Sequence, residues 1–183
     1  MCLQVASILT KYHTERNELA GTLPSELAEV NSLRVLLLEE GLITGTIPSQ
    51  YGSLNALEEI DLNFNLLRGT IPSQLYLLTN IRQLDLNDNE LTGSISPLIE
   101  NLKMLSFFQV ENNLMTGTIP TEFGNLPVLK VATMHSNSFQ GSMPSQVCQN
   151  STGVLAVLTA DCLGGPSRPS PPFVACDCCT QCF

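Results

Sequence analysis

Residues 42–48 read Leu-Ile-Thr-Gly-Thr-Ile-Pro, and residues 66–72 repeat the phrase as Leu-Leu-Arg-Gly-Thr-Ile-Pro. Asparagine stands four residues before the glycine in five copies of the phrase, and Gly41 takes its place in a sixth. A period of about 20 to 50 residues is the signature of repeat architectures, so this phrase decides the fold. The central glycine recurs every 24 residues at Gly21, Gly45, Gly69, Gly93, Gly117 and Gly141.

Apolar residues hold fixed columns around these glycines. The alternating Leu-x-Leu segment of each repeat predicts a short strand whose leucines face the core. The glycine, and the proline that follows it by three residues, prevent a regular helix from continuing through the turn. One unit cannot bury its own apolar columns, so the units must stack. We expect the asparagine column to lie inside, hydrogen-bonded to the backbone of the neighbouring coil. Gly41 lacks the amide, so we expect looser packing near that residue.

The pattern L-x-x-L-x-L-x-x-N-x-L-x-G-x-I-P resembles the plant-type leucine-rich repeat of receptor-like kinases, receptor-like proteins and polygalacturonase inhibitors. The resemblance implies an α/β repeat fold, a right-handed curved solenoid. It would have a parallel concave sheet of about seven strands, with 3-10 turns and short strands on the outer faces. Ser96 departs from the pattern where proline is expected, and Ala132 and Met134 predict a weakened sixth strand.

The two ends of the chain differ from the repeats between them. We assign residues 1–147 to the repeats, the first of them incomplete, and residues 148–183 to a cysteine-rich cap. Leu3, Ala6 and Leu9 fall on core columns of a previous repeat, so we expect the natural protein to begin upstream. No basic and apolar leader is recognisable at Met1. Residues 155–159 are predicted to form a seventh strand.

The cap holds six cysteines, and such clustering indicates an oxidising compartment. Six cysteines pair in fifteen ways that the sequence does not separate. Zinc is the alternative, but adjacent Cys178 and Cys179 suit one tetrahedral ion poorly, so we predict disulfides and no metal. The tail also resembles the cysteine-rich ends of secreted leucine-rich-repeat proteins of diatoms and related algae. The predicted disulfide residues are Cys148, Cys162, Cys176, Cys178, Cys179 and Cys182.

Asn150 begins Asn150-Ser151-Thr152, the only N-x-S/T sequon in the chain. Such sequons accept N-linked glycans in secreted proteins, and this one lies at the start of the cap. We therefore predict glycosylation at Asn150.

Charge and motifs exclude several classes of function. Seventeen acidic and eight basic residues give a net charge of −9, which argues against nucleic acid or an anionic membrane as partner. No run approaches the 18 or so apolar residues of a membrane span. His13 and His135 lie in different repeats, and no nucleophile motif or phosphate-binding loop is present. The carboxylates are expected on an open face, unsuited to acid–base catalysis. We predict no enzyme and no cofactor.

The outward positions of the predicted strands carry the functional signal. These 24 positions, in four columns across six strands, hold eight of the seventeen carboxylates. One reading is a solvated surface that keeps the protein soluble. The other is a binding face, because Phe64 and Phe107 are expected to be exposed among these negative charges. The predicted ligand-binding residues are Glu39, Glu40, Glu59, Asp61, Phe64, Asp85, Asp88, Phe107, Glu111 and His135.

These observations predict an extracellular or cell-surface recognition module that binds a basic protein or peptide on its concave face. One alternative is an ectodomain fragment of a receptor-like kinase or receptor-like protein. Another is an ice- or surface-adsorbing protein that uses a hydroxyl column directly after the repeat glycines. The ligand, the oligomeric state and calcium binding by the acidic face are left open. The hydroxyl column comprises Thr22, Thr46, Thr70, Ser94, Thr118 and Ser142.

Overall fold

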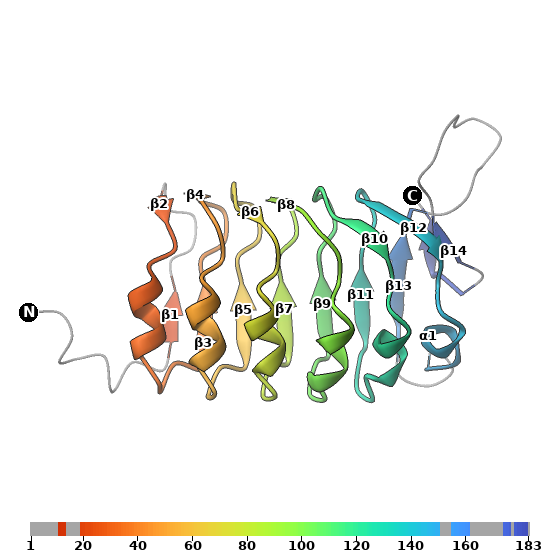
Figure 1. The fold of residues 1–183 in the computed structure, drawn as a ribbon, viewed down its shortest axis with the longest axis horizontal. Coiled ribbons are helices and arrows are strands. Elements are labelled where there is room, and N and C mark those ends of the chain that lie inside the picture. The colour runs from red at the N-terminus through yellow and green to blue at the C-terminus, as the bar shows by residue number, and fades with distance from the viewer. Residues whose placement is uncertain (1–10, 14–18, 151–154, 162–173, 177, 183) are drawn as a thin grey trace, which may run out of the picture.

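The computed structural model describes residues 11–13, 19–150, 155–161, 174–176 and 178–182, with the backbone alone described for His13, Asn150 and Cys182. Successive 24-residue repeats form successive coils of a solenoid (Figure 1). Each coil places one strand in a common sheet and then returns through a short outer strand or turn and a 3-10 helix. The leucine-rich-repeat solenoid expected from the repeat period is confirmed.

Eight parallel strands form the main sheet, and the face of this sheet turned away from the core is the concave face. All seven predicted strands are present, and a strand from the cap adds an eighth. The strands pair in register from repeat to repeat, so that Asp61 lies opposite Asp85. In spatial order they are β1 (Lys11–His13), β3 (Val35–Leu37), β5 (Glu59–Asp61), β7 (Gln83–Asp85), β9 (Phe107–Gln109), β11 (Val131–Thr133), β13 (Val157–Ala160) and β15 (Gln181–Cys182).

Outer parallel strands and short helices complete the described coils. The outer strands pair as β2 with β4, β6 with β8, and β10 with β12 and β14. They are β2 (Ala20–Thr22), β4 (Leu42–Thr44), β6 (Arg68–Gly69), β8 (Glu90–Leu91), β10 (Thr116–Thr118), β12 (Ser138–Ser142) and β14 (Val174–Ala175). The helices are η2 (Ser25–Glu29), η3 (Ser49–Ser53), η4 (Ser73–Leu77), η5 (Pro97–Asn101), η6 (Thr121–Asn125) and α1 (Ser145–Asn150).

The departure at Ser96 is absorbed locally. Proline in an extended conformation precedes four of the five 3-10 helices in the described residues, but Ser96 precedes η5. The Ser96 hydroxyl accepts a hydrogen bond from the Leu98 N–H at 3.2 Å. This is the capping contact that serine favours at a helix start, and Pro97 then supplies the fixed φ one residue later.

The apolar columns form one continuous core. Ala132 and Met134 are fully buried, and β11 pairs with both β9 and β13, so the weakening expected in the sixth strand does not disrupt the sheet. Register explains this result, because Phe108 is the strand partner of Ala132. A large ring beside a small side chain conserves the volume of the layer. Phe108 also packs edge-on against Phe123, with ring centroids 5.4 Å apart.

The asparagine column lies inside, as predicted. The Asn89 Oδ1 accepts from the Leu67 N–H at 3.0 Å, and its Nδ2 donates to the Leu62 carbonyl at 2.9 Å. The same arrangement recurs at Asn65, Asn113 and Asn137, so each amide joins two coils. The slack expected at Gly41 is not seen. A Cβ there would lie 2.8 Å from the Asn65 Oδ1, because the backbone closes onto that amide where the side chain is missing.

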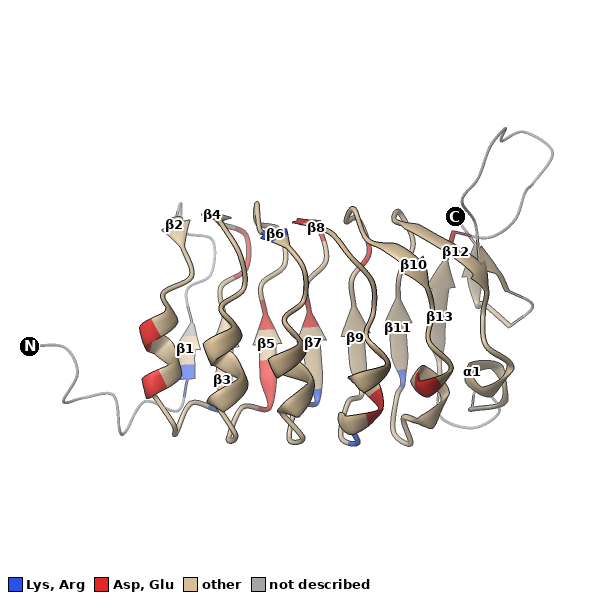
Figure 2. Ribbon diagram, in the orientation of Figure 1, with Lys and Arg blue, Asp and Glu red and all other residues tan. Residues whose placement is uncertain are grey.

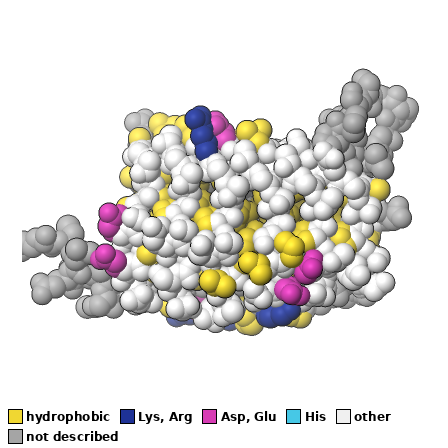
Figure 3. All heavy atoms as spheres, in the orientation of Figure 1, with side chains coloured by type: hydrophobic (Ala, Val, Ile, Leu, Met, Phe, Trp, Pro, Cys, Tyr) yellow, Lys and Arg dark blue, Asp and Glu magenta, His cyan; other side chains and the backbone are white. Residues whose placement is uncertain are grey.

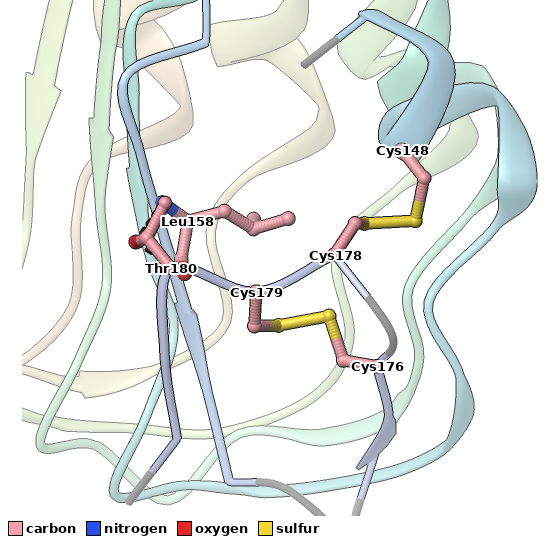
Figure 4. The surroundings of a disulfide bond; sticks show 6 residues. All are labelled: Cys148, Leu158, Cys176, Cys178, Cys179 and Thr180. Carbon is pink, nitrogen blue, oxygen red and sulfur yellow. Dashed lines mark hydrogen bonds between the residues drawn. A yellow bond between two sulfur atoms is a disulfide. The ribbon is translucent and has the colours of Figure 1, made fainter. Parts of the chain in front are cut away.

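Two disulfides lie within the described part of the cap (Figure 4). Cys148 of α1 is bonded to Cys178, and Cys176 is bonded to Cys179. The Leu158 N–H donates to the Thr180 Oγ1 at 2.9 Å, which ties the last strand to β13. The structure thus pairs four of the six predicted disulfide cysteines. The predictions for Cys162, and for the side chains of Cys182 and Asn150, lie outside the described residues.

Candidate ligand-binding face

The predicted binding residues gather on the middle of the concave face. Acidic residues mark β5 and β7, which lie next to each other in the sheet (Figure 2). Asp61 ends β5 and Asp85 ends β7, and Glu59 begins β5. The structure therefore brings together the central acidic residues that the sequence placed on this face.

Asp61 and Asp85 are buried, which corrects the expectation of an open face. Their exposed fractions are only 6% and 5%. Each side chain turns back onto the backbone two residues ahead. The Asn63 N–H donates to the Asp61 Oδ1 at 3.1 Å, and the Asn87 N–H donates to the Asp85 Oδ1 at 3.4 Å. Aspartate commonly bonds the backbone in this way at a turn, and here the turn follows the strand directly.

Burial and like charges alter the acidity of both carboxyls. Burial is the main cause that raises the pKa of Asp61 to about 6, and Glu39 and Glu59 add to it. Burial likewise raises the pKa of Asp85 to about 7, with further contributions from Asp61 and Glu111. Desolvation and nearby negative charge both disfavour a carboxylate. All the charged groups that contribute to these two shifts are acidic.

The acidic residues beside this pair are engaged in hydrogen bonds. Asp88 accepts from the side-chain amides of Asn87 at 2.7 Å and of Asn112 at 3.0 Å. Glu111 accepts from the Thr133 hydroxyl. The His135 Nδ1 lies 2.8 Å from the Thr159 Oγ1. These contacts fix the orientations of the Asp88, Glu111 and His135 side chains.

The two predicted aromatic anchors differ. Phe64 is 52% exposed, as expected. Its backbone φ is +49°, in a left-handed turn that recurs at the equivalent position of successive coils, as at Asp88. Phe107 is half-buried, which corrects the expectation that it is exposed. Its strand partners Gln83 and Val131 flank it on both sides in the sheet.

Of the remaining predicted residues, Glu39 and Glu59 lie close enough to Asp61 to affect its pKa. Glu39 and Glu59 are half-buried, and Glu40 is exposed in the left-handed turn of its coil. Sequence reasoning missed Asn63 and Asn87, whose Oδ1 atoms are buried without a hydrogen-bond partner. A signal was present, because Asp-Leu-Asn occurs at both 61–63 and 85–87.

The opposite face of the solenoid is different in character. Figure 3 shows few charged side chains there and apolar side chains gathered over the middle coils. All six residues of the hydroxyl column are exposed, as surface adsorption would require. The Thr46 Cγ2 lies 3.0 Å from where a Cβ would sit on Gly69, so the column also leaves little room for a side chain on the next coil.

The comparisons with known proteins concern the repeats. A family model described as Leucine Rich Repeat matches residues 56–78 and 80–102. Among curated proteins, no sequence matches the chain. None of the helices in the described part has both the length and the apolar character of a membrane span.

Solved structures of plant receptors share the fold. The ectodomain of GASSHO1/SCHENGEN3 from Arabidopsis thaliana, in complex with CASPARIAN STRIP INTEGRITY FACTOR 2, is 31% identical with a TM-score of 0.79, over 87% of this chain and 20% of that chain. The Arabidopsis receptor kinase HAESA, in complex with the peptide hormone IDA and the co-receptor SERK1, is 32% identical with a TM-score of 0.79. The match covers 85% of this chain and 26% of that chain. The plant peptide hormone receptor RGFR1, in complex with RGF2, is 35% identical with a TM-score of 0.74. The match covers 79% of this chain and 23% of that chain. The chain thus spans about a fifth to a quarter of the length of these structures.

Proposed function

We propose, from the premise that this chain is a leucine-rich-repeat solenoid like those of plant receptor ectodomains, that it is an extracellular recognition module. It binds a protein or peptide on its concave face. The solved relatives are receptors in complex with peptides or co-receptors, which supports binding as the activity. The disulfides of the cap support an extracellular location, because such bonds persist in oxidising compartments.

The observation that carries this proposal is the conformation of Phe64. A bulky side chain in a left-handed backbone is disfavoured by about 1–2 kcal/mol. Burial of the ring does not offset that cost, because more than half of Phe64 is exposed. Asp88, Asn112 and Ser136 hold the equivalent turns with polar side chains. A strained, exposed aromatic is a reason to infer a binding role, since a partner that covers the ring would supply the missing burial.

The charge around Phe64 indicates the kind of partner. The ion pairs seen among the described residues join Arg34 and Arg82 to Glu58, and Arg68 to Glu90. These glutamates lie outside the group of predicted ligand-binding residues. The field at β5 and β7 is therefore negative, and it attracts a cationic partner. We propose a basic peptide or protein segment that also carries an apolar side chain.

A receptor ectodomain is the narrower form of the same proposal. The solved receptors are four to five times as long as the matched segment, so the chain would then be one part of a longer recognition surface. A full transcript that encodes a transmembrane helix and a kinase downstream would support the receptor. A stop codon directly after Phe183 would instead support a secreted binder.

Selection from a random dodecapeptide library on the purified protein tests the proposal. The expected peptides are enriched in arginine or lysine together with apolar residues, and their association slows as salt rises. Counter-selection on the Phe64→Ala variant should remove them. Peptides that bind both proteins equally would show that the concave face is not the binding surface.

A further inference from the structure

The half of the concave face nearer the cap carries an apolar strip. It consists of Phe107, Val131 and Val157, which begin β9, β11 and β13, and each of them is half-buried. The residue after each of them is at most 1% exposed and lies in the core. Side chains alternate between the two faces of a sheet, so the three residues of the strip point out of the concave face.

The strip is continuous from strand to strand. Val131 is the register partner of Phe107 on one side and of Val157 on the other. Neighbouring strands lie about 4.8 Å apart, so the three side chains form one row across the sheet. Single exposed apolar residues are normal on a protein surface, whereas a contiguous apolar patch with polar residues around it marks a site of interaction.

Polar side chains beside the strip bond to one another. The Thr133 hydroxyl donates to Glu111, and the His135 Nδ1 lies 2.8 Å from the Thr159 Oγ1. These pairs satisfy part of the polar surface around the strip within the protein itself. The strip therefore offers a partner apolar contact rather than hydrogen bonds.

The concave face changes character between β7 and β9. Gln83 on β7 is the other register partner of Phe107, and it is also paired with Glu59 on β5. Acidic residues mark β5 and β7 in Figure 2, whereas β9, β11 and β13 contain no charged residue. An acidic half and an apolar half thus lie side by side along one sheet.

We propose that the apolar strip binds an apolar side chain of an extended peptide ligand whose basic residue lies over β5 and β7. This inference rests on the proposed function and specifies how the ligand is placed along the face. Charge complementarity selects the occupant, because the acidic half attracts a cationic residue and the rest of the peptide then continues across the strands. Phe64 follows β5 on the acidic half, so the strip is a second and separate apolar contact.

Strand spacing sets the distance between the two ligand residues. Val131, in the middle of the strip, lies three strands from Glu59, which corresponds to about 14 Å. An extended peptide advances about 3.3 Å per residue, so four residues cover about 13 Å. Residues four positions apart in an extended chain also point to the same side. The ligand should therefore carry an arginine or lysine four positions from an apolar residue.

The test compares two peptides of equal composition. The probe is acetyl-Gly-Arg-Ser-Gly-Ser-Leu-Gly-amide, and the control, acetyl-Gly-Arg-Ser-Gly-Leu-Ser-Gly-amide, has a separation of only three positions. Both are also tested in reversed order, because the direction of the bound peptide is set by its backbone. Binding to the isotopically labelled full chain is followed by NMR at the methyl groups of Val131 and Val157. In one of the two orders we expect the probe to shift both signals and to bind about tenfold more tightly than its control.

A matched pair of variants separates binding from stability. Val131→Thr keeps a β-branched side chain that suits a strand, and it should weaken the probe about fivefold because the apolar contact is reduced. Val128→Thr makes the same substitution outside the sheet, at a residue that is 37% exposed, and should leave the affinity unchanged. Apolar neighbours across strands also stabilise a sheet, so urea denaturation of both variants is measured alongside. A Val131→Thr variant that loses stability but binds the probe normally would give the strip a structural role only.

Equal affinities for the two spacings in both orders would overturn the inference, and this comparison uses the unaltered protein. If library peptides bind through Phe64 while the spacing has no effect, the strip is wrong and the proposed function stands. If no library peptide binds the concave face, the proposed function itself fails.

Discussion

Asp61 and Asp85 are partners on adjacent parallel strands, and both carboxyl groups are buried on the concave face. Like charges directly opposite each other in a sheet repel, so the pair is unfavourable when both groups are ionised. Glu39, Glu59 and Glu111 add further negative charge around the pair. A positive partner, as proposed above, would relieve this repulsion, and the charge state of the face is sensitive to pH.

The first prediction concerns stability against pH. The pKa values of Asp61 and Asp85 are raised to about 6 and about 7 from an ordinary value of 3.8, so the folded state binds more protons than the unfolded state between those limits. The free energy of unfolding contributed by the pair is complete below about pH 4 and is lost as pH rises through 7. Asp85→Asn should remove part of this loss and stabilise the protein by about 1–3 kcal/mol at pH 8. Urea denaturation from pH 4 to 8 measures the difference, and an unchanged slope in the variant would contradict the assignment.

The second prediction separates stability from binding at Phe64. Phe64→Asn should raise the free energy of unfolding by about 0.5–1 kcal/mol, because asparagine tolerates the left-handed backbone better than phenylalanine does. The same change should weaken a selected peptide by about 2 kcal/mol, or roughly 30-fold. Leu77→Asn on η4 is the control, since Leu77 is exposed to a similar extent on another face. A destabilised Phe64→Asn variant would show that the ring supports the fold.

The third prediction concerns the internal asparagines. Asn89→Ala removes hydrogen bonds to the Leu67 N–H and to the carbonyls of Leu62, Leu86 and Asn87. Buried backbone groups left without partners should cost about 3 kcal/mol or more in the free energy of unfolding. Replacement of the exposed Asn55 by alanine should cost less than about 0.5 kcal/mol. Thermal and urea denaturation measure both variants. Similar losses in the free energy of unfolding for Asn89→Ala and Asn55→Ala would contradict a structural role of the internal asparagines.

The fourth prediction ranks the two disulfides that lie in the described residues. Cys148 and Cys178 are 30 residues apart, whereas Cys176 and Cys179 are only three apart. The chain-entropy relation assigns about 3–4 kcal/mol to the longer loop and about 1.5 kcal/mol to the shorter one. Replacing Cys148 and Cys178 by serine should lower the thermal midpoint of unfolding more than replacing Cys176 and Cys179 by serine does. Peptide mapping that joins the four cysteines differently would refute the assignment.

Much of the fold follows from the 24-residue period. A repeating unit places its strands in register, so the position and order of the strands β1 to β13 and the internal asparagines are predictable. Ala132 was harder to judge, because its effect depends on Phe108 in the neighbouring strand. The eighth strand, β15, lies in the cap, where the repeat no longer applies.

The acidic concave face was predictable in location but not in detail. The repeat pattern predicts that a side chain points outward from the sheet, but it does not predict how much of that side chain is exposed to solvent. Asp61 and Asp85 are buried because their carboxyls fold onto the backbone of Asn63 and Asn87. That contact depends on the turn after each strand, which periodicity alone does not describe. Phe107 is half-buried for a similar reason, since its neighbours in the sheet determine its exposure.

The central claim is that the concave face is the binding surface. Its most direct test is the affinity of one library-selected peptide, measured by titration calorimetry, for three proteins. These are the unaltered chain, a concave variant with Phe64→Ala and Asp85→Asn, and a hydroxyl-column variant with Thr46, Thr70 and Thr118 changed to alanine. We predict that the concave variant binds at least about 30-fold more weakly and that the hydroxyl-column variant binds within about twofold of the unaltered chain. A loss of binding in the hydroxyl-column variant, with the concave variant unaffected, would contradict the account.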